Sequence, residues 1–295
     1  MANFPTSLPS ATPANHGEVV GELVAIATAL IGMPGRNQVV NGNFRTNQRA
    51  YASAGALASG AYGFDRWKST TASSSMTFTA APQGQTVTIN SGGSFAQIVE
   101  RAFVEADTYT LTWAGTATGR VYNVGGSVPS YAASPVTVAV DGLADLTVEF
   151  TAAGGTRTLG AVQLEVDGPT PFERVHPGLE LAMCQRYFRR IAANQAIGDQ
   201  NPIVTTGYVT SSTTARFPVM LASAMRTPPS LVATVGGFGL YDGVGAGVVS
   251  GITLLSATVD IVSLHVTASG LTAGRAADFY NNAAAPAYLD LSAEL

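Results

Sequence analysis

The chain has 295 residues, of which 46% are hydrophobic and only 12% are charged, about half the usual share of ~25%. Lys68 is the only lysine and the formal net charge is −4, so nothing builds a phosphate-binding surface and we do not expect nucleic acid as a partner. Cys184 is the only cysteine, which excludes an internal disulfide framework and a cysteine-based zinc site and fits assembly in a reducing cytoplasm. The abundance of Thr, Ser, Gly, Asn and Ala suits β-structure with short turns.

Residues 1–15 contain three prolines with serine and threonine between them, which predicts an extended tail. We expect this tail to dock on a sister chain or on a larger assembly. The apolar run that follows, over 19–31, is shorter than the ~20 residues that span a bilayer, and Glu22 interrupts it. No Lys or Arg precedes it, so the sequence predicts neither a signal peptide nor a membrane anchor.

Residues 16–34 are predicted to form a helix. Asn15 and Glu18 make a capping-box pattern at its start, and Gly32 and Pro34 end it. Its apolar residues follow the 4-3-4 spacing of a coiled-coil seam. Two heptads are too few to hold a coiled coil alone, and the stripe could instead pack on its own β-domain, but we favour a trimerising helix. The seam residues are Val19, Leu23, Ile26 and Leu30.

Residues 37–175 alternate between apolar and polar positions, as strands do. The sequence "TYTLTW" sets Tyr109, Leu111 and Trp113 on one face, and "PVTVAV", "LTVEF" and "AVQLEV" repeat the period of two. Glycine-rich turns separate these runs. Several short strands with regular turns predict an antiparallel, jelly-roll-like β-sandwich.

Residues 176–202 are predicted to be a linker with a short helix. Its arginines would form a solvated face, paired with Glu180 or with a neighbouring chain. The segment 203–295 is again β-like and predicts a second sandwich as a C-terminal tip domain, including a hairpin and a terminal strand "AYLDLSAEL". The predicted apolar face of the helix is Leu181, Cys184, Phe188 and Ile191, and the arginines are Arg186, Arg189 and Arg190.

The sequence shows no pattern that indicates catalysis. Nucleophile-elbow, P-loop and zinc-protease motifs are absent, and the histidines lie far apart, without carboxylate or cysteine neighbours at ligand spacing. We therefore predict no cofactor, no metal site and no enzymatic activity. The histidines are His16, His176 and His265. The acidic pairs that folding could bring together are Glu100 with Glu105 and Asp141 with Asp145.

The aromatic residues of the first β-domain are better candidates for a binding function. Sugar rings stack on exposed aromatic side chains, while polar groups bind their hydroxyls. Tyr122 and Tyr131 flank the glycine-rich turn "NVGGSVPS" and are well placed for exposure. Trp67 is expected to be a core anchor. Trp113 is a third glycan-binding candidate, although its alternation with Tyr109 also fits a core position.

A polar stretch, "NQVVNGNFRTNQR", opens this domain at residues 37–49 with six side-chain amides and two arginines. Side-chain amides are unfavourable to bury unpaired and useful for tying backbone segments together. Direct sugar contact is one interpretation. We favour a structural latch, in which Asn41-Gly42 makes a tight turn and the other amides bind the backbone of adjacent strands.

Several motifs together resemble a known family. "VVNGNFRTNQR", then "YGFDRW", then "AVQLEVDGPTPFERVHPGLELAMCQRYFRR" resemble a pattern common in tail-fibre and receptor-binding proteins of tailed bacteriophages. The two ends of the chain are similar to the attachment tail and the C-terminal module of such proteins. The resemblance implies a homotrimeric virion fibre or spike that attaches to host cell-surface polysaccharide, with a sandwich over 37–175 that is similar to carbohydrate-binding modules. Residues 1–15 would anchor it to a tail adaptor or to the capsid. The short helix and the lack of a long shaft favour a compact spike.

Two other functions stay open. A head-decoration or connector protein would stabilise the particle without binding a receptor, and contact of residues 1–15 with capsid subunits would favour it. An envelope polysaccharide hydrolase would need two carboxylates about 5 to 9 Å apart in an open groove. The sequence gives no reason to prefer any acidic pair for that role.

Overall fold

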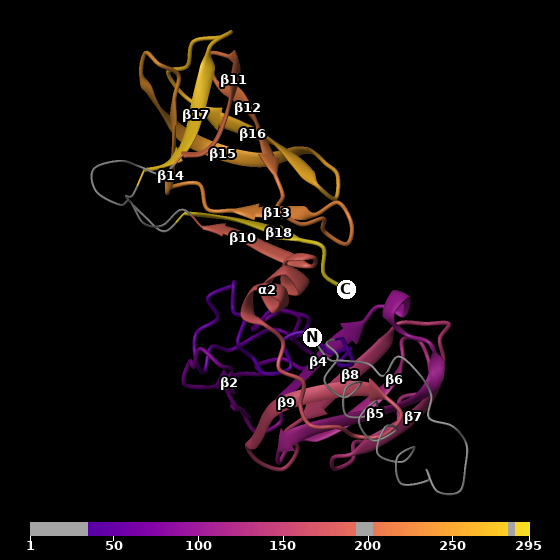
Figure 1. The fold of residues 1–295 in the computed structure, drawn as a ribbon. Helices are drawn as coiled ribbons and strands as arrows, with labels where there is room; N and C mark the ends of the chain where they lie inside the picture. Colours follow the sequence, from indigo (N-terminus) through magenta and orange to yellow (C-terminus); the bar gives the residue numbers. More distant parts are fainter. Residues whose placement is uncertain (1–34, 193–202, 283–286) are drawn as a thin grey trace, which may run out of the picture.

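The computed structural model describes residues 35–192, 203–282 and 287–295 (Figure 1). In these ranges the chain is mainly β, as predicted, with antiparallel sheets around two hydrophobic cores. None of the helices described is long and apolar enough to cross a membrane. The predictions that lie outside the described residues are the tail 1–15, the helix 16–34 with its seam Val19, Leu23, Ile26 and Leu30, His16, and the end of the linker, 193–202.

The first core lies between two antiparallel sheets, with strand orders β1-β4-β8-β6 and β2-β3-β9-β5-β7. Alternate residues of each strand point inward, so Phe150 of one sheet and Leu111 and Leu164 of the other are fully buried, together with Trp67. This arrangement is consistent with the predicted sandwich. The strands are β1 Lys68–Ser69, β2 Met76–Thr77, β3 Val87–Ile89, β4 Ser94–Val99, β5 Ala106–Gly115, β6 Thr118–Asn123, β7 Val136–Asp141, β8 Leu146–Thr151 and β9 Arg157–Val166, with a 3-10 helix, η2, at Arg101–Phe103.

The second core fills a closed barrel with strand order β11-β12-β16-β15-β14-β17. Strand β11 pairs with β12 on one side and with β17 on the other, so the sheet has no free edge. The sandwich predicted for 203–295 is corrected to this barrel, because alternation is the same in both folds and only the pairing distinguishes them. The strands are β11 Ile203–Ser211, β12 Thr214–Met220, β14 Phe238–Tyr241, β15 Ala246–Ala257, β16 Ile261–Ala268 and β17 Ala276–Asn281.

A helix and a three-stranded sheet lie between the sandwich and the barrel (Figure 1), and Leu289 and Leu291 of this sheet belong to the second core. Helix α2, Pro177–Gln185, begins after His176, whose Nδ1 accepts a hydrogen bond from the Gly178 amide at 3.2 Å. The sheet has the order β10-β18-β13, and the predicted terminal strand is its central strand. Its strands are β10 Phe188–Ala192, β13 Ser230–Ala233 and β18 Tyr288–Ser292.

The helix predicted for this segment is shorter than expected. Cys184 lies on it and is buried, but Phe188 and Ile191 belong to β10, where they pair with Ser292 and Leu289 of β18. Backbone pairing with the chain terminus, about 100 residues away in sequence, outweighs the local helical spacing. The predicted pairing of these arginines with Glu180 is wrong, because Glu180 binds Arg45. Arg186 binds Glu100 and Arg190 binds Asp290.

The polar stretch 37–49 binds backbone, as the latch interpretation predicts. The Asn37 side chain accepts a hydrogen bond from the Leu164 amide at 3.0 Å. Asn41 is 1% exposed, and its side chain accepts from the Thr46 amide at 2.9 Å and donates to the Thr46 carbonyl at 2.8 Å. These bonds satisfy amides that would be unfavourable to bury unpaired.

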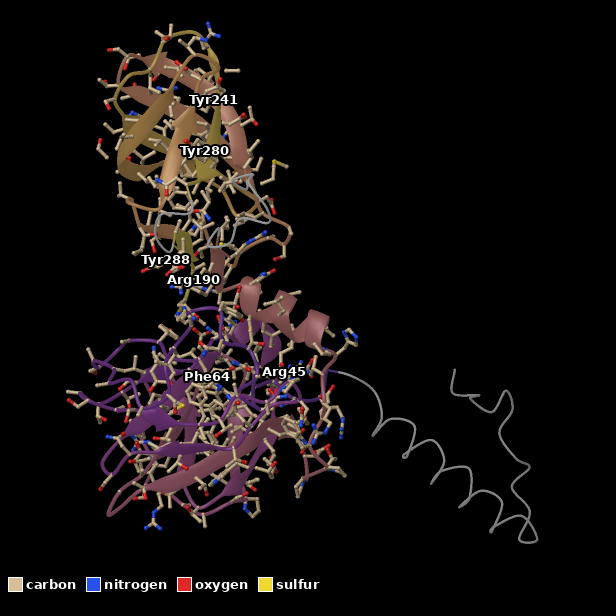
Figure 2. The ribbon with its side chains drawn as sticks, turned by 90° about the vertical axis from the view of Figure 1, so that its left-hand side faces the viewer. Arg45, Phe64, Arg190, Tyr241, Tyr280 and Tyr288 are labelled. Atoms are coloured by element: carbon tan, nitrogen blue, oxygen red, sulfur yellow. The ribbon has the colours of Figure 1, made fainter. Side chains whose placement is uncertain are left out.

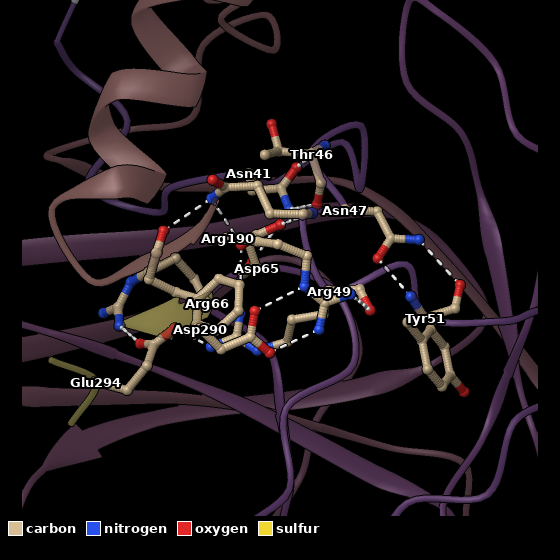
Figure 3. A network of polar contacts seen from close by, with 12 residues as sticks. Asn41, Thr46, Asn47, Arg49, Tyr51, Asp65, Arg66, Arg190, Asp290 and Glu294 are labelled. Atoms are coloured by element: carbon tan, nitrogen blue, oxygen red, sulfur yellow. Dashed lines mark hydrogen bonds and ion pairs between the residues drawn. The ribbon is translucent and has the colours of Figure 1, made fainter. Parts of the chain in front are cut away.

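Ion pairs then tie the first core to the end of the chain (Figure 3). Arg66, with a side chain 2% exposed, and Arg49, with one 12% exposed, both bind the carboxylate of Glu294, Arg49 at 3.1 Å. Arg190 binds both oxygens of Asp290, at 2.7 and 2.6 Å. We call these residues, with Asp65, which also binds Arg49, the junction network.

Replacing Glu294 by Gln tests the junction network. The substitution leaves the buried Arg66 guanidinium without its counter-charge, and breaking one side of a buried ion pair typically lowers the free energy of unfolding by about 3–5 kcal/mol. We expect a loss of that size, measured by urea unfolding. Glu105→Gln, at an exposed position, is the matched control and should change stability by less than about 0.5 kcal/mol. Equal effects of the two variants would contradict the role given to Glu294.

Candidate functional site

The outer face of the sheet β1-β4-β8-β6 carries a cluster of polar and aromatic side chains. Strand register places Arg120 of β6 directly opposite Glu149 of β8, and Tyr122 one outward position further along β6. Tyr131 comes from the following loop, which is held to β6 by a bridge between Gly119 and Ala132. We call Arg120, Tyr122, Tyr131 and Glu149 the tyrosine–arginine cluster.

The Glu149 carboxylate is the fixed centre of this cluster. One oxygen, Oε2, accepts hydrogen bonds from Nε and Nη2 of Arg120 at 2.8 and 2.6 Å. The other, Oε1, accepts from the hydroxyl groups of Thr70 at 2.8 Å and Ser94 at 3.2 Å. Burial raises the pKa of Glu149, but the bonds from Arg120 and Thr70 outweigh it and hold that pKa below its usual value. The carboxylate is therefore ionised at neutral pH and holds the arginine in one orientation.

The two tyrosines lie beside the fixed arginine. The guanidinium carbon of Arg120 is 4.0 Å from the ring centroid of Tyr131 and 5.4 Å from that of Tyr122, within cation–π range. The Tyr122 hydroxyl donates to Glu149 Oε2 at 3.2 Å, and the Tyr131 hydroxyl lies 3.4 Å from Ser94 Oγ. Both rings are half-buried. Burial raises the pKa of both phenols, so each keeps its proton at neutral pH.

A pocket lies next to the cluster. It has a volume of about 320 Å³ and is lined by Tyr122 and by the glycine-rich turn 123–130, within the usual range of about 300–1,000 Å³ for ligand sites. Val128 in this turn is 54% exposed. The predicted exposure of the tyrosines beside this turn is thus accompanied by a concave surface.

Trp113 does not belong to this site, and its place among the glycan-binding candidates is corrected. Its side chain points into the first core, where it packs edge-on against Phe150 with ring centroids 5.0 Å apart. Its indole Nε1 donates to the Ala117 carbonyl at 2.9 Å. The residue is 7% exposed, and Trp67 is fully buried, as expected. The alternation with Tyr109 and Leu111 had already indicated a core position.

Sequence reasoning missed the two charged members of the cluster. Arg120 and Tyr122 occupy alternate positions of "TGRVYN" and so share one face of a strand. Glu149 is the outward residue between Val148 and Phe150. Period-two reasoning could have placed each on an outer face. Arg120 and Glu149 meet because β6 pairs with β8, and no local sequence pattern predicts that pairing.

Among the described residues no three His, Cys, Asp or Glu side chains gather in a group that could hold a metal ion. Burial raises the pKa of Asp65 to about 6, against the lowering effect of Arg49, but Asp65 is fully buried in the junction network and cannot reach a substrate. His265 lies in β16, in agreement with its predicted position in a strand. The tyrosine–arginine cluster can stack and hydrogen-bond a ligand.

The comparisons with known proteins add little. No family model matches the chain, and no curated protein matches it. Among solved structures, it is similar to a cycloisomaltooligosaccharide glucanotransferase of a Paenibacillus species, solved in complex with cycloisomaltoheptaose. That match has 11% sequence identity and a TM-score of 0.23, and covers 80% of this chain and 46% of the other. It spans less than half of the enzyme and carries no argument about fold or function.

Glu149→Gln should loosen the cluster. The substitution removes the charge that holds Arg120, and we expect the free energy of unfolding to fall by about 1–3 kcal/mol at pH 7. Because the pKa of Glu149 is lowered by folding, the carboxylate stabilises the fold above the ordinary glutamate pKa of about 4.3, and this contribution is lost as the pH falls below it. Chemical unfolding of the unsubstituted protein and of Glu149→Gln should therefore show a difference in the free energy of unfolding that shrinks from pH 7 to pH 3. A constant difference would contradict the role of the charge.

Proposed function

We propose that this chain is an attachment protein of a tailed-bacteriophage particle, a trimeric tail fibre or spike that binds host cell-surface glycan without enzymatic activity. The observation that carries the binding role is the tyrosine–arginine cluster: two half-buried tyrosine rings beside a fixed guanidinium, next to a pocket on a sheet surface. The virion role rests on the sequence motifs that resemble tail-fibre proteins. The low charge and the single cysteine of the chain fit a particle protein assembled in the host cytoplasm.

The chemistry of the cluster favours a neutral sugar over an anionic one. Glu149 neutralises the Arg120 charge, and Arg120 Nη1 also donates to the Pro129 carbonyl at 3.1 Å, so little of its donor capacity is left for a ligand carboxylate or phosphate. The apolar C–H face of a pyranose suits the face of Tyr131 or Tyr122. Its hydroxyls suit the phenolic group of Tyr122 and the amide of Asn123, which both line the pocket.

The finer organisation belongs to the same proposal. A tail over 1–15 would bind a tail adaptor or the capsid, and a helix over 16–34 would trimerise through Val19, Leu23, Ile26 and Leu30. The sandwich and the barrel would follow as two successive β-domains, with the barrel at the distal tip. A mass measurement that found a monomer would overturn the trimer. Contact of residues 1–15 with capsid subunits, in place of tail proteins, would favour a head-decoration protein.

Alanine substitution of Tyr122 and Tyr131 tests the binding role. Truncation of an aromatic residue central to an interface typically weakens binding by 2 kcal/mol or more, and 1.4 kcal/mol is a factor of ten. We expect each variant to bind host-cell surfaces and arrayed bacterial glycans at least about tenfold more weakly than the unsubstituted protein.

Leu143→Ala provides the control, since Leu143 is 66% exposed and lies in the turn between β7 and β8, outside the cluster. It should bind as the unsubstituted protein does. Full binding by the Tyr122→Ala/Tyr131→Ala double variant would overturn the site, and failure of the unsubstituted protein to bind any host envelope glycan would overturn the receptor role.

A further inference from the structure

A second group of exposed tyrosines lies on the outer wall of the barrel. Register places Tyr241 of β14 opposite Asp278 of β17, and Asp278 opposite Thr206 of β11 on its other side. Tyr208 of β11 faces Ala276, one outward position along β17. Tyr208 is 50% exposed and Tyr241 is 47% exposed.

A groove lies beside Tyr241 and over Ala276, the small residue that pairs with Tyr208. It has a volume of about 480 Å³ and is lined by Tyr241, Gly243, Arg275, Ala276 and Asp278. Strands lie about 4.8 Å apart and rise about 3.4 Å per residue, so the two tyrosine Cα atoms, two strands and two residues apart, are separated by roughly 12 Å. That separation is longer than one sugar ring, and the small side chain of Ala276 leaves room there for a ligand.

The rim of the groove is held in place by hydrogen bonds. The Asp242 carboxylate accepts from the amides of Val244 and Gly245, both at 3.0 Å, and from that of Thr272 at 2.8 Å. Arg275 Nε donates to the Asp242 carbonyl at 2.8 Å. Tyr241 therefore precedes a fixed turn, and a ligand would not have to order this turn on binding.

The neighbouring Tyr280 closes one end of this face. Figure 2 shows Tyr241 and Tyr280 on the barrel, away from the junction with the first core. A Cβ atom on Gly239 would lie 2.5 Å from the Tyr280 ring, so the phenolic end of the ring lies close to the backbone of β14. The glycine makes room for an aromatic side chain on the outside of the barrel, where it adds nothing to the core.

Polar groups stand between the aromatic rings. Oδ1 of Asp278 accepts from the Thr206 hydroxyl at 3.0 Å, and the carboxylate keeps acceptor capacity at its second oxygen. Arg275 is exposed and presents guanidinium donors at the other side of the groove. Rings that stack sugars, with a carboxylate and a guanidinium for hydroxyl groups between them, form a saccharide-binding arrangement.

We propose that this groove is a second saccharide site, which takes a neutral oligosaccharide laid obliquely across β11, β17 and β14, with sugar rings on Tyr208 and Tyr241 and hydroxyl groups on Asp278 and Arg275. It extends the proposed attachment role, but it depends on barrel residues alone. A second copy of this chain would be the other candidate occupant. The core of a protein–protein interface is depleted of charge, whereas the carboxylate of Asp278 and the guanidinium of Arg275 both line this groove.

The experiment uses the full chain and an array of neutral oligosaccharides from bacterial O-antigens and capsules. In a Tyr122→Ala/Tyr131→Ala background, we expect residual binding that falls at least about tenfold on Tyr241→Ala or Tyr208→Ala, and also falls on Asp278→Asn. Met220→Ala is the control: Met220 is 72% exposed on β12, outside the groove, and its truncation should leave binding unchanged.

The outcomes separate the two sites. Complete loss of binding in the Tyr122→Ala/Tyr131→Ala background, with normal binding by Tyr208→Ala/Tyr241→Ala, would overturn the barrel site and leave the proposed function intact. Binding lost only with the barrel tyrosines would support the barrel site and overturn the tyrosine–arginine cluster. A smaller mass for Tyr208→Ala/Tyr241→Ala in sedimentation, with unchanged saccharide binding, would assign the groove to a second copy and overturn the proposal.

Discussion

The structure depends on the burial of two arginines near the start of the first domain. Arg49 and Arg66 are almost fully covered, and a buried charge is tolerated only when it is paired and hydrogen-bonded. Their shared counter-charge is Glu294, which lies 245 and 228 residues further along the chain. The Arg66 guanidinium therefore meets its carboxylate partner only when the residues that follow β18 are in place. Folding of the first core is in this way coupled to docking of the C-terminal residues.

This constraint explains why the most distinctive sequence motifs meet at one place. The polar stretch 37–49, "YGFDRW" and "CQRYFRR" all contribute to the junction network, where the guanidinium of Arg66 also lies 3.5 Å from the ring centroid of Tyr187, and that of Arg49 lies 3.5 Å from that of Phe188. These motifs join the first core to the end of the chain. They do not identify a ligand, so the ligand surface has to be sought among side chains outside the junction network.

Local patterns predicted much of the fold. Alternation placed the strands of the first sheets, the barrel hairpin and the terminal strand, and turn composition indicated that Tyr122 and Tyr131 are accessible. Long-range pairing could not be predicted in the same way. Three features depend on strand register, which a single sequence does not reveal. They are the pairing of β11 with β17, the pairing of residues 188–192 with the last strand, and the contact of Arg120 with Glu149 on adjacent strands. The assignment of Trp113 was ambiguous because a core face and an exposed face have the same period.

An arginine packed on an aromatic ring occurs both in the junction network and in the tyrosine–arginine cluster. The solvent exposure of the pair determines whether it can contact a ligand. In the junction, Arg66 on Tyr187 is closed off from solvent, and the pair serves the fold. In the tyrosine–arginine cluster, Arg120 lies 4.0 Å from the Tyr131 ring centroid with both side chains partly accessible. Because only 12% of the residues are charged and the net charge is −4, long-range electrostatic steering would contribute little to capture of a glycan. Stacking and hydrogen bonding at one shallow site give modest affinity. In the proposed trimer several such sites on one particle would act together, so that firm attachment follows from effective concentration and not from tight individual contacts.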